Sequence, residues 1–518
     1  MKRILFILSI ILVGGMFLVS TSRGAMTWRV GDEGEISFGG YLENLTGYKI
    51  GQEQAGRNCS FRNTLLPEFL FTFNRDAKLF VSGRFAKEIG YEMEDNIRAD
   101  MGLSPLSDDY YDETEFEPWE LYLDLTLAGR SHLRVGKQFI IWGETDVFRL
   151  LDVINPQDSS WAPPALMPLE ETRLPVYAMR FIYDFSPFTN LEFVFVPMID
   201  EDENLTDKGA PTGGRWAIHP EERVTSQPQL YPAMGPDIGA LMGQFGPGTV
   251  IPNVTVMRPE SDLDQSRVGV RFTTVVKRVT LSFADYYGHN LGPPVIHYHG
   301  TTREVRHELV EGPFGNAYYD DVNYYHPNLS VRWKRQNVLG MAMNYFDDRW
   351  TDCVFRGEVA YRHDKPYATF GEEKGAVKMD TISYCFGIDR DFFFPLIHPD
   401  DPNRTIFASF QIFQDIILGN EDDLHITGYL TDLDKVTTNF TFKINTGYCR
   451  DVYNPELIIA YDPKGNGMVC PSFTYKPPWS ERYYLETRYI NYFGSHSYNG
   501  LGFFREKDAV FFRLRYMW

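Results

Sequence analysis

The chain ends in the stretch Ala509-Val510-Phe511-Phe512-Arg513-Leu514-Arg515-Tyr516-Met517-Trp518. In an extended strand, successive side chains face opposite sides. One side of this strand would be apolar and would consist of Val510, Phe512, Leu514, Tyr516 and Trp518. The other side would carry two arginines and would consist of Phe511, Arg513, Arg515 and Met517. The stretch therefore predicts an amphipathic β-strand.

An amphipathic strand that ends in an aromatic residue resembles the closing strand of a Gram-negative outer-membrane β-barrel. Phe512, Leu514, Tyr516 and Trp518 would then form the apolar side of the barrel-closing strand. The resemblance implies the barrel assembly machinery as a partner, because such a strand also serves as the assembly signal. The alternative is an ordinary terminal strand of a water-soluble β-protein, and this stretch by itself favours neither.

The beginning of the chain predicts export. Met1-Lys2-Arg3 precedes an apolar run from Ile4 to Val19 and a small, polar stretch that ends at Gly24. A charged start, an apolar run and small residues describe a secretory signal peptide, here residues 1–24. No later apolar run reaches the roughly 18 residues that a transmembrane helix needs. The five cysteines include no close pair and their odd number leaves at least one unpaired, so the sequence predicts no particular disulfide.

The composition suits a barrel and excludes one class of partner. Aromatic residues make up 15% of the chain, whereas the mean hydropathy is only −0.31. This combination is expected where lipid-facing residues alternate with polar residues of a lumen. The net charge of −20 argues against nucleic acid, whose binding needs a basic surface.

The alternation of the last strand recurs along the chain. Trp119, Leu121, Leu123 and Leu125 alternate with Glu120, Tyr122, Asp124 and Thr126. Similar patterns occur in residues 69–73, 79–85, 177–185, 267–272, 355–362, 382–389 and 440–444. Repetition over the whole chain predicts an all-β fold and favours a transmembrane barrel over a soluble sandwich.

The connections point to the same architecture. Short turns are expected at 74–77, 128–131, 186–190, 275–278 and 463–467, and long polar stretches at 92–118, 140–174, 198–263 and 288–323. We therefore predict that residues 25–518 form a single antiparallel barrel of about 16 to 18 strands, with short periplasmic turns and long extracellular loops. Candidate strands number about 19, although bacterial barrels have even numbers. The ambiguous region is 323–390, where 334–337 and 347–352 both have the composition of turns.

One internal stretch is distinctive. Residues 133–144 read LRVGKQFIIWGE, residues 152–158 read DVINPQD, and residues 170–176 read EETRLPV. The first run predicts a strand that ends at a bend. A short helix over Thr145–Val153 would follow and would end at Asn155-Pro156. We expect the loop of residues 140–174 to fold into the lumen and narrow it.

These three runs resemble the proteobacterial outer-membrane family of unknown function DUF1302. Members carry a similar strand, a Trp-Gly-Glu bend, an Asn-Pro-x-Asp turn and a Leu-Pro strand start. The resemblance is specific over residues 133–197. It implies an outer-membrane barrel, often encoded near exporters of the resistance-nodulation-division (RND) type or near the metabolism of hydrophobic compounds. It implies no catalytic or ligand residues.

The polar residues of this region are candidates for a pore constriction, because opposite charges across a lumen select small solutes. They are Lys137, Gln138, Trp142, Glu144, Asn155, Asp158 and Arg173. The alternative is that they pin the loop to the wall, since polar groups of a buried loop need hydrogen-bond partners in any case. The residues expected to face the lumen from the strands are Arg180, Asp184, Arg267, Arg271, Arg356, Glu358, Arg513 and Arg515.

Other motifs are weaker. His297 and His299 share one strand face, but a metal site normally needs three or four ligands. The acidic run 108–115 lacks the spacing of a calcium loop. We expect no metal, no cofactor and no enzyme activity, since hydrolase, zincin and haem motifs are missing from the sequence.

The sequence therefore favours a porin-like outer-membrane channel that passes small or hydrophobic solutes. Its surroundings would be outer-membrane lipid and lipopolysaccharide. Two alternatives stay open. One is an accessory barrel of an exporter or lipid transport system, with an RND-type exporter as partner, and this rests on the family resemblance alone. The other is a barrel hydrolase acting on lipids.

Overall fold

The protein is described from a computed structural model. The described residues are 26–50, 58–90, 114–198, 235–311, 317–369, 377–419, 424–425, 433–494 and 500–518, except 32, 128, 160, 164–165, 168, 252, 261, 293–294, 400, 402–403 and 506. The expected signal peptide and residues 108–113 of the acidic run lie outside them. Within these ranges, no helix has the length and apolar character that crossing a membrane requires.

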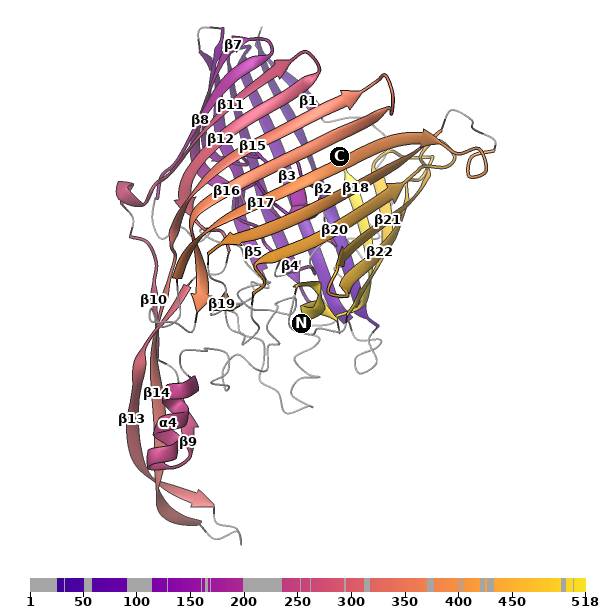
Figure 1. The fold of residues 1–518 in the computed structure, drawn as a ribbon. Coiled ribbons are helices and arrows are strands. Elements are labelled where there is room, and N and C mark those ends of the chain that lie inside the picture. The colour runs from indigo at the N-terminus through magenta and orange to yellow at the C-terminus, as the bar shows by residue number, and fades with distance from the viewer. Residues whose placement is uncertain are drawn as a thin grey trace.

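Eighteen antiparallel strands close into one barrel (Figure 1). In order around the wall they are β2 (Gly34–Lys49), β3 (Asn58–Asn74), β4 (Ala77–Glu88), β5 (Thr114–Leu127), β6 (Ser131–Gln138), β7 (Val176–Ser186), β8 (Thr189–Val196), β11 (Arg267–Val276), β12 (Val279–His289), β15 (Arg335–Asp347), β16 (Cys353–Thr369), β17 (Val377–Phe393), β18 (Thr405–Leu418), β20 (Val436–Asn445), β21 (Tyr453–Asp462), β22 (Asn466–Tyr475), β23 (Tyr483–Phe493) and β24 (Ala509–Met517). The predicted all-β antiparallel barrel is confirmed, at the upper end of the expected strand number.

The barrel closes where its last strand meets its first long strand. β24 pairs with β2 from Tyr41↔Met517 to Lys49↔Ala509. The rest of the same edge of β2 pairs with the short strand β1 (Met26–Val30), from Met26↔Phe38 to Val30↔Gly34. Together, β24 and β1 cover the edge of β2 from Lys49 to Gly34, so little backbone is left unpaired there.

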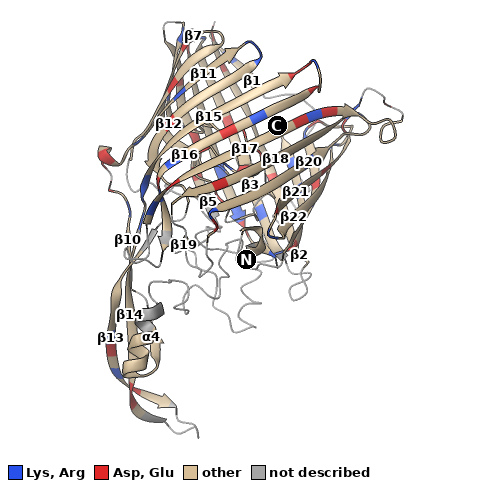
Figure 2. Cartoon of the chain, in the orientation of Figure 1, with Lys and Arg blue, Asp and Glu red and all other residues tan. Residues whose placement is uncertain are grey.

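Alternate residues of the strands divide into two faces, as the sequence predicts. Large apolar side chains that are exposed on the outside include Val270, Phe272, Val359, Phe410 and Phe512. Charged neighbours of these residues, among them Glu358 and Arg513, are buried inside. Figure 2 shows charged residues colouring the turns at the rim. An apolar outer face combined with a charged inner face is typical of a barrel that is embedded in lipid.

Most of the short turns lie at one end of the barrel, which we call the short-turn end. They include residues 75–76, 187–188 and 277–278. The opposite, long-loop end carries the connection 139–175. The turn at Pro463–Gly465 also lies at the long-loop end, because it joins β21 to β22 and the single strand β21 separates it from the preceding connection, β20 to β21, at the short-turn end. The length of a turn therefore does not show at which end of the barrel it lies.

An arm explains the odd strand count from the sequence. β13 (Val295–Glu311) and β14 (Ala317–Arg332) form a hairpin in a separate sheet, with β9 (Gly248–Val250) and β10 (Asn253–Met257) along β14. The helices α4 (Gly235–Phe245) and η3 (Leu263–Gln265) precede β9 and β11, respectively. Figure 1 shows this arm projecting beyond the barrel. The stretch 288–323, expected to be a polar loop, is largely β13 and β14.

Of the two turns expected in the region 323–390, one is a turn of the barrel. Residues 348–350 form a turn between β15 and β16. Residues 333–334 connect the arm back to the barrel, where the amide of Asn290 donates to the carbonyl oxygen of Lys334 (3.0 Å). The two-residue strand β19 (Leu424–His425) pairs with the end of β16 and adds nothing to the barrel wall.

A β-bulge changes the predicted face of Trp119. Trp119 and Glu120 of β5 together oppose Ser82 of β4, whose hydroxyl accepts a hydrogen bond from the amide of Glu120 (3.0 Å). Trp119 is therefore buried inside, whereas Leu121 is 40% exposed outside. Pro118 has no N–H to give to the ladder, which is a physical reason for the bulge at this position.

The outer face supports a test of membrane depth. We expect Val270→Arg, in the middle of β11, to lower the free energy of unfolding by roughly 2 to 4 kcal/mol, because a charge at mid-depth must leave water. Val276→Arg is the matched control, since Val276 ends β11 beside the rim and its arginine can reach water; its cost is about 0 to 1 kcal/mol. Urea unfolding of the barrel in lipid vesicles measures both values. Equal costs would contradict this orientation in lipid.

Candidate functional site

Residues 139–175, which we call the plug segment, run inside the barrel and contact its inner wall. The expected helix over Thr145–Val153 is not formed, and the chain makes a series of bends there. Wall residues take over the backbone hydrogen bonds that a helix would make. Glu358 of β16 accepts from the amides of Glu144 and Leu151, the latter at 3.3 Å. The helix of the segment is α3 (Leu169–Thr172), a single turn.

Apolar packing fixes the plug segment against two parts of the wall. Ile140, Trp142, Leu150, Leu151 and Ile154 are buried with side chains of β7, β8, β12 and β15 to β18. Trp161, Leu166 and Met167 are buried with side chains of β2, β3 and β21 to β24 and of the 3₁₀ helix η4 (Gly500–Phe504). Each buried large side chain contributes about 1.5 to 3 kcal/mol. The plug segment is therefore part of the core of the protein.

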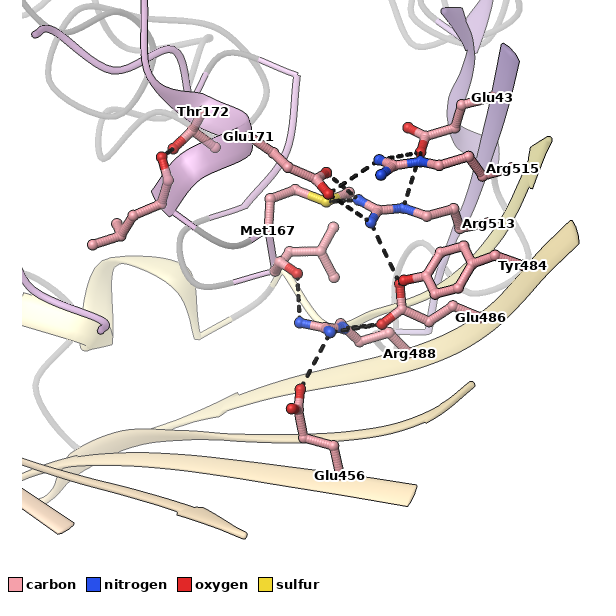
Figure 3. A network of polar contacts seen from close by, with 12 residues as sticks. Glu43, Met167, Glu171, Thr172, Glu456, Tyr484, Glu486, Arg488, Arg513 and Arg515 are labelled. Atoms are coloured by element: carbon pink, nitrogen blue, oxygen red, sulfur yellow. Dashed lines mark hydrogen bonds and ion pairs between the residues drawn. The ribbon is translucent and has the colours of Figure 1, made fainter. Parts of the chain in front are cut away.

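The closing strand binds the plug segment through ion pairs (Figure 3). Glu171 of α3 lies 2.9 Å from Nη2 of Arg513 and 3.0 Å from Nη2 of Arg515. Arg515 also pairs with Glu43 of β2 at 2.6 Å. Burial disfavours the charged form of Glu171, but the two guanidinium groups outweigh burial and hold its pKa below the ordinary value. Glu171 therefore stays ionised between two cations.

A second set of contacts extends this network along β23. Nη2 of Arg488 lies 2.6 Å from Glu486, and its Nη1 donates to the carbonyl oxygen of Leu166 in the plug segment (2.7 Å). Glu486 in turn lies 3.6 Å from Arg513. Figure 3 shows Tyr484 beside Glu486, to which its hydroxyl donates (2.9 Å). One continuous network thus joins the plug segment to β2, β23 and β24.

On the other side, β16 holds the tip of the plug segment. Arg356 lies 2.7 Å from Asp146 of the segment and 2.7 Å from Asp389 of β17. Arg362 donates to the carbonyl oxygen of Leu150 (2.7 Å). The tip is therefore held by charge-assisted bonds to backbone and carboxylate, which are stronger than neutral ones.

Five of the seven residues proposed for a constriction are fastened within the wall or the base of the segment. Asn155 and Gln138 are fully buried. Arg173 pairs with Asp152 at 2.7 Å, Nζ of Lys137 lies 3.2 Å from Glu117, and the amide of Asp158 donates to the carbonyl oxygen of Thr172 (2.7 Å). These positions match the alternative that the residues pin the loop.

The other two residues have different surroundings. Trp142 is buried against Tyr286, with their rings edge to face at 6.3 Å. Glu144 lines a cavity of about 270 Å³, together with Arg180, Glu192 and Arg271. Glu144 is therefore the member of the set that lies beside open space.

Six of the eight residues expected to face the lumen form ion pairs. Arg180 and Arg271 both bind Glu192, each at 2.7 Å. Asp184 lies 3.3 Å from His132 near the short-turn end. Arg267 is fully buried. Arg356, Glu358, Arg513 and Arg515 all contact the plug segment, as described above.

Several residues of the site were not predicted from the sequence. Glu43, Glu192, Glu486 and Arg488 occupy inner positions of strands, and the two-residue alternation could have found them. Asp146 and Glu171 lie in an irregular segment, where no periodicity marks the direction of a side chain.

The base of the plug segment offers a test of its fastening. Oδ1 of Asn155 accepts from the amide of Ile140, and its Nδ2 donates to the carbonyl oxygen of Leu174, both at 2.8 Å. Asn155→Ala leaves both buried groups unsatisfied, so we expect a loss of about 1 to 3 kcal/mol in unfolding free energy. The control Asn454→Ala removes an exposed bond to Asp451 and is expected to stay within about 0.5 kcal/mol of the parent. If Asn155→Ala left the free energy of unfolding in urea unchanged, the pinning role would be contradicted.

The largest described cavity lies between the plug segment and strands β17 to β23, with a volume of about 600 Å³. Its lining contains six carboxylates and four cationic side chains. They are Asp146, Glu170, Asp391, Asp451, Glu456 and Glu486, and Arg404, Lys443, Lys476 and Arg488. A third cavity, of about 210 Å³, lies between the plug segment and β2 to β5. Polar space therefore adjoins the plug segment on several sides.

Possible metal ligands lie away from these cavities. In the part of the chain that the structure describes, one group could hold an ion, namely His363, Asp364 and Asp380 of β16 and β17. Its carboxylate Asp364 already pairs with Lys378 at 2.8 Å. His297 and His299 lie on the arm, where Nε2 of His299 is 2.7 Å from the hydroxyl of Ser330.

A family model described as "Protein of unknown function (DUF1302)" matches residues 56–517. No curated protein matches the chain. Solved structures that are similar include Acinetobacter baumannii OccAB3, at 12% identity and a TM-score of 0.46, covering 93% of this chain and 99% of that one. Pseudomonas aeruginosa OccK5 (OpdH) has 9% identity and a TM-score of 0.44, covering 94% and 97%. The outer membrane protein OpdK of the same organism has 9% identity and a TM-score of 0.46, covering 94% and 99%.

Proposed function

Because the chain belongs to the DUF1302 family of proteins of unknown function, whose name assigns no activity, we propose from the geometry that it is a porin-like channel of the outer membrane. The plug segment is the constriction of this channel, and the cavities beside it are the path for small solutes. The observation that carries the proposal is the charged interior, because a barrel filled only for stability has no need of ion pairs beside open cavities.

The outer surface supports a place in a membrane. Exposed apolar residues cover the strands, and large apolar side chains gather at the short-turn rim, among them Phe188, Trp350, Phe393 and Trp479. Aromatic girdles at the interfaces flank the apolar band of outer-membrane barrels. We assign the short-turn end to the periplasm and the long-loop end to the cell exterior on the same grounds.

The charges of the largest cavity suggest which ions pass more easily. Six carboxylates against four cationic side chains leave an excess of negative charge beside the plug segment. A lumen with an excess of negative charge raises the local concentration of cations over that of anions. We therefore assign the channel a preference for cations.

Ion conductance in a planar lipid bilayer tests this function. The refolded mature protein is expected to give discrete, reproducible current steps, and a salt gradient should give a reversal potential that favours cations. Heat-denatured protein serves as the control. A barrel that is verified as folded by its shifted gel mobility, but that never conducts, would overturn the proposal.

A further inference from the structure

The pairing of β3 with β4 lacks two residue pairs. Their pairing runs from Arg62↔Glu88 to Leu65↔Phe85 and resumes at Glu68↔Ser82. Pro67 lies in this gap, opposite Gly83. Proline has no N–H to donate and is normally excluded from the interior of a sheet. The hydrogen-bonded ladder is therefore broken at this height of the wall.

A second irregularity adjoins the first. β4 pairs with β5 at Val81↔Leu121 and then at Gly83↔Pro118, with the bulge of Trp119 and Glu120 between them. Gly83 thus faces a proline on each neighbouring strand. We call Pro67, Gly83 and Pro118 the wall gap. Three adjacent strands lack regular pairing there, so separating them costs fewer hydrogen bonds than elsewhere.

Open space lies directly behind the wall gap. The cavity of about 210 Å³ is lined by the residues next to it, namely Leu66, Glu68, Arg84, Trp119 and Glu120. On the outer side, Phe85 and Phe116 are exposed and their rings pack with centroids 4.5 Å apart. A single layer of irregular strand therefore separates an apolar outer surface from this cavity.

The lining of the cavity has both aromatic and acidic parts. Tyr41, Trp119, Phe139 and Trp161 contribute aromatic rings. Its arginines are engaged: Arg84 pairs with Glu117 at 3.0 Å, Arg515 with Glu43 at 2.6 Å, and Arg62 lies over the Trp161 ring at 5.1 Å.

The acidic side of the cavity is less fully compensated. Among the residues that the structure describes, Glu68, Glu120 and Glu170 line the cavity without an ion pair to lysine or arginine. The lining holds five carboxylates against three arginines, so its formal charge is negative. Aromatic faces next to negative charge suit an organic cation with an apolar body.

Another strand pair shows that a proline alone leaves no such space. The pairing of β22 with β23 is also interrupted, at Cys470 and Pro471. Behind that position, Met468, Cys470 and Ile490 are buried in the core that packs on the plug segment. Behind the wall gap, Leu66 and Trp119 pack with Leu174 of the plug segment, but this smaller packed group borders a cavity of about 210 Å³.

We propose that the wall gap is a lateral portal, through which an amphiphilic organic cation passes between the bilayer and the cavity behind β3 to β5. The cation sits near Glu68 and Glu120, and its apolar chain lies against Leu66, Trp119 and the outer rings of Phe85 and Phe116. This portal deepens the proposed channel function and rests on it, because it gives the substrate class and the side from which the substrate comes.

A reversible cross-link across the gap tests the portal. Pro67 and Gly83 are opposite each other in neighbouring strands, so the pair Pro67→Cys and Gly83→Cys can form a disulfide. Phe272→Cys with Phe283→Cys, a regular outward pair of β11 and β12, is the matched control. Both pairs are made with Cys449→Ser, because Cys449 is the exposed cysteine among the five.

The probe is dodecylamine carrying a photoreactive diazirine on its chain, supplied only in the lipid of the vesicles that hold the protein. We expect light to label peptides containing Trp119 or Glu68 in the reduced P67C/G83C protein. Oxidation should lower this labelling at least fivefold, and the control disulfide should not change it. Equal labelling before and after oxidation would overturn the lateral route.

The charge of the ligand is tested separately. Glu68→Gln with Glu120→Gln is expected to lower labelling by the amine several-fold, whereas tetradecanoic acid with the same diazirine should label the parent weakly. Stronger labelling by the acid than by the amine would overturn the cation assignment. Conductance of the oxidised P67C/G83C protein should equal that of the reduced form, so loss of the portal and loss of the channel are distinguishable.

Discussion

Replacing residues 144–151 with two glycines is expected to raise the single-channel conductance several-fold. The backbone favours this shortening, because a Cβ added at Gly143 would lie 2.9 Å from the amide nitrogen of Asp152, so the two ends already meet. The change removes Asp146, the partner of Arg356, and exposes the cavity of about 600 Å³. It keeps Asn155 and Arg173, which fasten the base of the plug segment.

Planar bilayer recordings on matched proteins measure this effect. The control removes residues 305–320 from the arm, whose strands β13 and β14 lie outside the barrel wall, and it should leave the conductance unchanged. A difference in gel mobility between unheated and heated samples verifies that each variant is folded. A folded variant without residues 144–151 that conducts like the parent would mean that the plug segment does not limit the current.

Arg513→Ala is expected to destabilise the barrel by about 3 to 5 kcal/mol, because removal of one member of a buried ion network leaves the others uncompensated. Arg513 is 5% exposed and lies within 4 Å of Glu43, Glu171 and Glu486. It also contacts the sulfur of Met167 in the plug segment. The variant therefore weakens both the seam of the barrel and the attachment of the plug segment.

Equilibrium unfolding in urea, followed by tryptophan fluorescence in lipid vesicles, measures this loss. Arg278→Ala is the control, since Arg278 and its partner Asp348 are both more than 40% exposed at a turn. An exposed pair contributes about 0 to 1 kcal/mol. If the two variants lost the same stability, the buried network would have no special part in holding the fold.

The fold could be predicted because a lipid environment requires apolar residues on the outer face of every strand, where they alternate with inward-facing polar residues. The last strand already divides Phe512 from Arg513, and the structure places Phe512 outside and Arg513 inside. The rule fails where the backbone departs from regular pairing. Trp119 follows Pro118 in a bulge and faces inward. The alternation of the sequence does not reveal this bulge, which shifts the register by one residue.

The arm and the plug segment were harder to predict for different reasons. Residues 288–323 were expected to be a polar loop, because β13 carries charged residues on both faces, as at Arg303 and Glu304, and so shows no continuous apolar face. The plug segment depends on partners far away in the chain. The pair of Glu171 and Arg513 spans 342 residues, and nothing local to either residue indicates the other. The same holds for Glu358, which replaces the helical hydrogen bonds of Glu144 and Leu151.

The long separation of these partners has a consequence for the order of assembly. Trp161, Leu166 and Met167 leave the ribosome long before β21 to β24, on which they pack. Contacts between such distant segments form late, because the intervening chain must first be ordered. Until then the plug segment has no apolar surface to cover it on that side. We therefore expect docking of the plug segment and pairing of β24 with β2 to be one coupled final step of folding, because a barrel that closed first would exclude the plug segment.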